Sequence, residues 1–138
     1  MKLNKTHHVA IIVSDYEKAR EFYVDKLELP IIRENYREER NDYKLDLQVG
    51  DIELEIFGVK NPPKRVTNPE ACGLRHFAFH VDDIEEAVEW LHAKGIETES
   101  IRWDEYTGKR MTFFRDPDDL HVTILLLLQY HLHEMQSV

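Results

Sequence analysis

Apolar and polar positions in the first part of the chain follow the order strand, helix and three further strands. A β-branched run over 8–13 predicts the first strand, and Asp15 is placed to cap a helix over 16–27. In that helix the apolar residues recur at helical spacing, opposite charged positions; they are Ala19, Phe22, Tyr23 and Leu27. The remaining strands are predicted over 31–36, 43–49 and 52–59.

The same order returns after a segment rich in proline and asparagine over 60–73, which is typical of a linker. A strand is predicted over 74–81, and a helix over 84–94 is followed by Gly95, a usual residue just beyond a helix end. Three more strands are predicted over 96–103, 110–115 and 120–128. The order β-α-β-β-β thus occurs twice.

The two halves are also similar in amino-acid sequence. A shift of 68 residues carries His8 onto His76 and gives eight identities among the 21 positions from 8 to 28. The repeat predicts an α+β fold of two β-α-β-β-β modules, at 7–59 and 74–128, with the linker 60–73 between them and a tail at 129–138. Because neither module is long enough for a full core, we expect them to pack together as a single domain, within one chain or across a dimer.

The composition of the chain limits its possible binding partners and its cellular location. The chain has 138 residues, 18 basic and 27 acidic, and a formal net charge of −9, with no long basic run, so we expect no nucleic-acid partner. The longest apolar run is too short to cross a membrane, and we expect no membrane partner. A single cysteine, Cys72, and the absence of a secretion signal at the N-terminus predict a cytoplasmic protein.

Eight histidines in an acidic chain raise the question of a metal. His8 and His76 open equivalent strands of the two modules, and Glu55 lies in the last strand of the first. Two imidazoles and a carboxylate suit one divalent ion such as Ni, Zn, Co, Mn or Fe. Taken singly, each residue is better explained without a metal, the histidines as satisfied side chains at strand ends and the glutamate as part of a solvated face. Their coincidence at one repeat offset favours a metal site.

Several stretches together resemble the glyoxalase I/bleomycin resistance/extradiol dioxygenase families, the vicinal oxygen chelate superfamily. They are His8-Val-Ala-Ile, Glu21-Phe-Tyr, the Glu55 strand, Gly73-Leu-Arg-His76-Phe-Ala-Phe and Phe114-Arg-Asp-Pro-Asp. The resemblance implies curled mixed sheets that form a metal-binding cleft, a homodimer and a small-molecule substrate that chelates the metal through oxygen atoms. It also implies a lyase or isomerase similar to lactoylglutathione lyase.

The family's metal ligands, His, Glu, His and Glu, fall on His8, Glu55, His76 and position 123, which is a threonine. In glyoxalase-type isomerisation the last glutamate is both a ligand and the base, and Thr123 cannot act as a base near neutral pH. Three alternatives remain open: water fills the fourth position, His121 replaces the missing ligand from the same strand face, or a frameshift has altered the C-terminal sequence. The catalytic residues are therefore unassigned.

The missing glutamate also keeps other functions open. One is a non-catalytic protein of the same fold that binds a small molecule, as bleomycin resistance proteins do. Another is a ring-cleaving dioxygenase, although that group usually keeps the carboxylate at the fourth position. Candidate pocket residues are Phe57, Phe113 and Arg75, of which the aromatic pair suits an apolar group and the arginine an anion.

Overall fold

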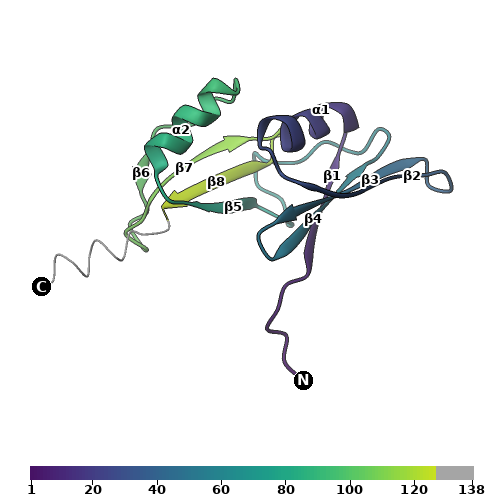
Figure 1. Ribbon diagram of the computed structural model, residues 1–138, viewed down its shortest axis with the longest axis horizontal. Helices are drawn as coiled ribbons and strands as arrows, with labels where there is room; N and C mark the ends of the chain where they lie inside the picture. The colour runs from purple at the N-terminus through teal and green to yellow at the C-terminus, as the bar shows by residue number, and fades with distance from the viewer. Residues whose placement is uncertain (127–138) are drawn as a thin grey trace, which may run out of the picture. The chain divides into compact units, whose positions relative to one another are not determined.

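The computed structural model describes residues 1–126, so positions 127 and 128 and the predicted tail at 129–138 lie outside the described residues. The chain divides into two compact units, one up to Arg65 and one from Val66 onward, and this boundary falls inside the predicted linker. Each unit has one four-stranded mixed sheet and one main helical segment (Figure 1). The predicted α+β fold class is therefore confirmed.

The first unit has its sheet in the order β1-β4-β3-β2, in which only the β1–β4 pair is parallel. Its elements are β1 (His8–Val13), α1 (Tyr16–Arg20), a π-helical segment (Glu21–Lys26), β2 (Ile31–Arg37), β3 (Asp42–Val49) and β4 (Ile52–Gly58). Asp15 caps α1, because its Oδ1 accepts the N–H of Lys18 at 3.1 Å. The buried side chains are apolar and belong to β1, the helical segment, β3 and β4; the largest are Tyr23, Leu45, Leu47, Leu54 and Ile56.

The second unit repeats this plan with the strand order β5-β8-β7-β6 and a parallel β5–β8 pair. Its elements are β5 (His76–Val81), α2 (Ile84–Ala93), β6 (Arg102–Trp103), β7 (Arg110–Arg115) and β8 (His121–Leu126). Asp83 caps α2 through the N–H of Glu86, at 3.0 Å. The core again joins helix to sheet and includes Ile84, Leu91, Phe114, Val122 and Ile124.

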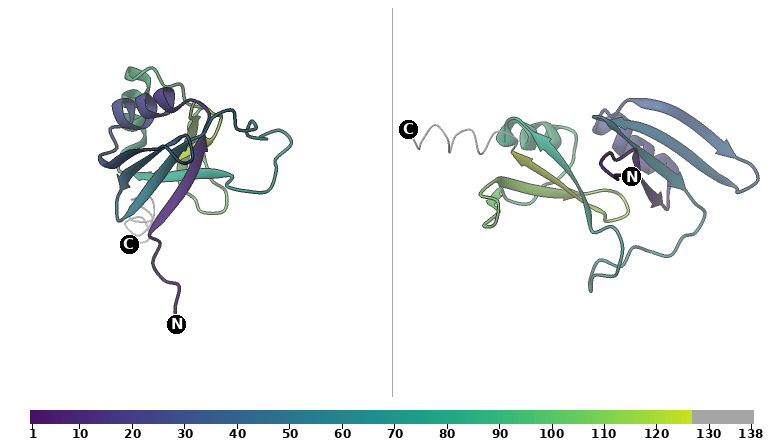
Figure 2. Two further views of the ribbon diagram at one scale, coloured as in Figure 1. Left: turned by 90° about the vertical axis from the view of Figure 1, so that its right-hand side faces the viewer. Right: turned by 90° about the horizontal axis from the view of Figure 1, so that it is seen from below.

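In each unit the helix covers one face of the sheet and leaves the other face open (Figure 2). Along β4, buried Leu54 and Ile56 alternate with half-buried Glu53, Glu55 and Phe57. Because side chains alternate across a strand, the two carboxylates and the phenyl ring share the open face. The predicted candidate residues of the first unit therefore lie on the face that its helix does not cover.

Two elements differ from their predicted extent. Most of the predicted strand over 96–103 has no regular structure, and only Arg102–Trp103 pairs, with Arg110 and Met111 of β7. The predicted helix over 16–27 is α-helical for its first five residues and π-helical thereafter. None of the described helices is long and apolar enough to span a membrane.

Candidate metal and substrate site

His8 and Glu55 meet on the open face of the first sheet. Their Nε2 and Oε2 atoms lie 3.5 Å apart, and the Glu55 side chain is only 13% exposed. Two donors bonded to one ion at about 2.1 Å and at the tetrahedral angle are about 3.4 Å apart. The pair therefore has the separation that two ligands of one divalent ion require.

The groups around this pair orient both side chains. The Nδ1 atoms of His7 and His8 lie within hydrogen-bond distance, at 2.9 Å, so the tautomer that protonates His8 on Nδ1 leaves its Nε2 lone pair toward Glu55. Lys44 Nζ lies 3.8 Å from Oε1 of Glu55, the oxygen that does not face His8. Metal-binding histidines and carboxylates typically use their second polar atom in this way, which fixes the orientation of the first.

Beside Glu55, the same face carries a buried carboxylate that sequence reasoning missed. The Asp46 side chain is 1% exposed and forms ion pairs with Arg33 at 2.9 Å and Lys44 at 3.0 Å. Burial alone would raise the pKa of Asp46, but the hydrogen bonds from Lys44 and Arg33 outweigh it and lower the pKa. The alternation of Lys44, Asp46 and Gln48 along β3 was the available signal, because it places them opposite Phe57, Glu55 and Glu53.

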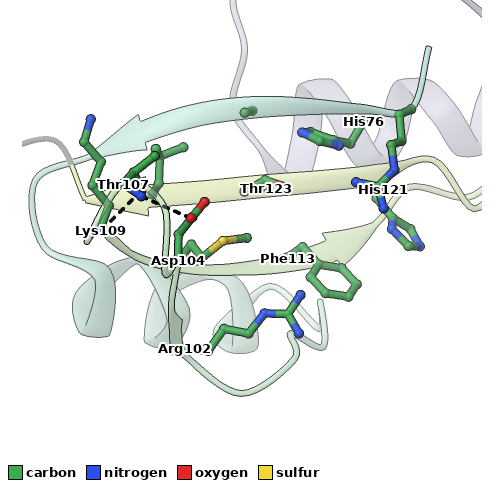
Figure 3. Close-up of a pocket in the computed structure, with 12 residues that line it drawn as sticks. His76, Arg102, Asp104, Thr107, Lys109, Phe113, His121 and Thr123 are labelled. Carbon is green, nitrogen blue, oxygen red and sulfur yellow. Dashed lines mark hydrogen bonds between the residues drawn. The ribbon is translucent and has the colours of Figure 1, made fainter.

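In the second unit, most of the remaining candidate residues line one pocket on the open face of the sheet (Figure 3). Its volume is about 510 Å³. Five of the predicted residues line it, namely Arg75, His76, Phe113, His121 and Thr123. Phe57, the remaining one, lies in the first unit, where the Arg37 guanidinium stands over its ring at 4.9 Å.

Strand pairing shows which position corresponds to Glu55. In the first unit His8 pairs with Glu53 and Ala10 with Glu55; in the second, His76 pairs with His121 and Ala78 with Thr123. The two registers coincide after the shift of 68 residues that carries His8 onto His76. Thr123 therefore occupies the strand position of Glu55, and His121 that of Glu53.

His121 is held by two neighbours. Arg115 Nε donates to its Nε2 at 3.3 Å, and the Phe113 ring stacks on it with centroids 4.8 Å apart. Its Nε2 is thus engaged by a cation. A metal bond from this atom would require Arg115 to move.

The three predicted ligands are divided between the two units. Among residues 1–126, no group of three or more His, Cys, Asp or Glu side chains lies close enough to hold a metal ion. The first unit contributes the His8 and Glu55 pair, and the second contributes His76 on its pocket wall. Their nitrogen and oxygen donors suit a borderline divalent ion.

Comparison with known proteins shows which family and which sequences this chain is similar to. The Glyoxalase/Bleomycin resistance protein/Dioxygenase superfamily model matches residues 5–124. YwkD of Bacillus subtilis (strain 168), an uncharacterised protein, is 58% identical over 121 residues, covering 87% of this chain and 94% of YwkD. The crystal structure of a glyoxalase family protein from Enterococcus faecalis has a TM-score of 0.86 at 51% identity, covering 91% of this chain and 99% of that one.

A more distant relative has a named activity. The metallothiol transferase FosB of Staphylococcus saprophyticus is 27% identical over 139 residues, covering 96% of this chain and 86% of FosB. The family model alone spans most of the chain, and the two four-stranded mixed sheets agree with it. The chain belongs to the glyoxalase/bleomycin resistance protein/dioxygenase superfamily.

Proposed function

We propose that this protein is a metal-dependent lyase or isomerase of glyoxalase type, acting on a small substrate that chelates the metal through oxygen atoms. His8, Glu55 and His76 are the proposed ligands of one divalent ion. The observation that carries the proposal is the 3.5 Å separation of His8 Nε2 and Glu55 Oε2. The family membership and the name of the relative FosB, a metallothiol transferase, support a metal-dependent reaction.

The bound ion would polarise two substrate oxygens and make an adjacent C–H bond more acidic. The chain's own residues have separate tasks. His8 and Glu55 would hold the ion, and the contact of Lys44 with the second Glu55 oxygen keeps the carboxylate turned toward His8. The second unit's pocket, lined by Phe113 and Leu125 among others, excludes water from the apolar part of the substrate.

Metal binding by three variants tests the ligand set. Each of His8→Ala, Glu55→Gln and His76→Ala should lower the affinity for Zn, Mn, Ni or Co by at least about tenfold, measured by calorimetric titration and elemental analysis. His92→Ala is the matched control, because His92 lies at the end of α2 and contacts Thr98. Equal metal affinity in all four variants and the native protein would exclude this ligand set.

Turnover tests the reaction. We expect the metal-loaded protein to convert the hemithioacetal of methylglyoxal and glutathione, or a related 2-oxo adduct, to a hydroxy-acid thioester, and the His8→Ala variant to lose that conversion. Conversion that is equally fast in His8→Ala would show that the proposed metal site does not carry the reaction. The assay follows thioester absorbance.

One observation favours a second candidate, a non-catalytic protein that binds a small molecule in the same pocket. Thr123 stands at the strand position of Glu55, so the pocket lacks a carboxylate there. A metal-loaded protein that binds a small chelating ligand but turns over no hemithioacetal would favour this candidate. In either case we propose that the protein forms a homodimer. Its single cysteine favours a location in the cytoplasm.

A further inference from the structure

The pocket of the second unit has an excess of positive charge within an acidic protein. Three cationic side chains line it, Arg75, Arg102 and Lys109, against one carboxylate, Asp104. Arg75 is compensated by an ion pair with Glu70 at 2.5 Å. Among the described residues, Arg102 and Lys109 have no ion-pair partner. The net charge of −9 makes this local excess unusual for the chain.

In the part of the chain that the structure describes, Asp104 forms no ion pair with either cation, and its carboxylate instead holds the β6–β7 turn together. Its Oδ1 accepts the backbone N–H groups of Tyr106 at 2.8 Å and Thr107 at 3.2 Å. The backbone N–H of Asp104 donates to the carbonyl of Lys109, and the carbonyl of Asp104 accepts from the N–H of Gly108. The turn is therefore well defined, and it carries a cation in β6 and another just before β7.

One of the two cations, Arg102, lies beside an apolar surface. The Arg102 guanidinium lies over the Phe113 ring, 5.3 Å from its centroid, as Figure 3 shows, and Met111 and Leu125 also line the pocket. A guanidinium stacked on an aromatic ring keeps its N–H groups free to bind an oxyanion. The cavity of about 510 Å³ falls in the range of small-molecule sites.

We propose that Arg102 binds the oxyanion of an organic acid whose apolar part lies against Phe113, Met111 and Leu125. This inference rests on the proposed function in naming the substrate class for the pocket that contains His76. Carboxylate and phosphate groups share the required chemistry, because both accept paired hydrogen bonds from a guanidinium. The substrate is then an anion with a chelating end near His76 and a charged end at Arg102, beside the Phe113 ring.

Benzoate and benzamide test the proposal, since they share a shape and differ in charge. We expect EDTA-treated native protein to bind benzoate at least about tenfold more tightly than benzamide in a calorimetric titration. Benzoate should also shift the ring resonances of His76 and His121 in a nuclear magnetic resonance spectrum, which places the ligand in this pocket. Phenyl phosphate, titrated in parallel, distinguishes a phosphate from a carboxylate preference.

Arg102→Gln should weaken benzoate binding by about three- to tenfold and leave benzamide binding unchanged. Lys94→Gln is the matched control, because it removes one positive charge from the same unit at the end of α2, beside Trp90. Equal binding of benzoate and benzamide, or equal benzoate affinity in Lys94→Gln and Arg102→Gln, would overturn the proposal.

Metal binding by the same variants separates the two proposals. Arg102→Gln should bind Zn as the native protein does, because Arg102 is not a proposed ligand. Since the benzoate titration is made without metal, loss of the metal site would not alter its result. A protein that binds benzoate through Arg102 but binds no metal would refute the proposed function and support the oxyanion site.

Discussion

Position 123 is the residue at which this chain departs most clearly from the glyoxalase ligand pattern. The pairing of Thr123 with Ala78 repeats the pairing of Glu55 with Ala10, so the departure does not come from a shift in strand register. Thr123 is 8% exposed and lines the pocket that also contains His76. The pocket thus has a threonine at the position where the resemblance to the family implies a carboxylate.

Thr123→Glu should restore that carboxylate and tighten metal binding by about tenfold or more, because an additional anionic ligand adds to the charge attraction. Thr123→Gln is the matched control, having the same length without the charge. Calorimetric titration with Zn or Mn measures the difference. Equal affinities for the two variants would mean that position 123 does not face the metal.

Asp46 controls a different property, the dependence of stability on pH. Because its folded-state pKa is lowered, it stabilises the fold above its unfolded pKa of about 3.8, and this contribution is lost as the pH falls through the lowered value. Asp46→Asn should lower the free energy of unfolding at pH 7 by about 1–2 kcal/mol, since Arg33 is half exposed and its pairing is screened.

The same variant should also show a flatter fall in stability between about pH 5 and pH 2 than the native protein. Urea unfolding at several pH values measures both effects. Asp51→Asn, in the exposed turn between β3 and β4, controls for the loss of one negative charge. A slope in Asp46→Asn as steep as that in Asp51→Asn would contradict the role assigned to Asp46.

At the scale of elements, Gly58 sets how closely the end of β4 approaches the start of α1. A Cβ built on Gly58 would lie 2.9 Å from both Cβ and Cδ1 of Tyr16. The Tyr16 ring is also stacked on Tyr43, with centroids 4.2 Å apart, and its hydroxyl donates to Glu34. The ring therefore has little freedom to move aside.

Gly58→Ala should lower the free energy of unfolding by about 1–3 kcal/mol, because the added methyl group overpacks this contact. Tyr16→Ala removes the ring and should relieve part of the clash, so the double variant should lose less than the sum of the two single losses. Urea unfolding of the three variants provides the comparison. Strict additivity would show that the Tyr16 ring does not resist the methyl group.

Strands that belong to the repeat were predictable because buried and open faces impose a period of two on the sequence. The shift that aligns His8 with His76 also relates the β1–β4 and β5–β8 registers. The 96–103 segment was only partly confirmed as a strand, because the Glu99 N–H donates to the Phe113 carbonyl of β7 but regular pairing is confined to the last two residues. Of its eight residues, only Arg102 and Trp103 pair with β7, although Glu99 also accepts a hydrogen bond from Thr112.

The sequence could predict only those candidate site residues whose type by itself suggests metal binding, such as histidine and glutamate. His8, Glu55 and His76 stand out because few other roles need those residues at one repeat offset. The cations Arg102 and Lys109 did not stand out, since charged residues near turns are common on surfaces. Their significance depends on the fold of the β6–β7 turn, which brings both to one pocket.

At the scale of the whole molecule, the proposed ligand set draws on both units, and the proposed homodimer offers two ways to complete it. If each metal site takes His8 and Glu55 from one chain and His76 from the other, two inactive variants can complement each other. In a mixed dimer of His8→Ala and His76→Ala chains, one site then contains both substitutions and the other contains neither.

Co-refolding the two variants in equal amounts should therefore restore about a quarter of the native high-affinity metal sites, because half of the dimers are mixed and each has one intact site. Metal content after gel filtration measures the recovery, and each variant refolded alone is the control. If the site lies within one chain, every site in the mixture keeps one substitution. Metal content would then stay at the level of the separate variants.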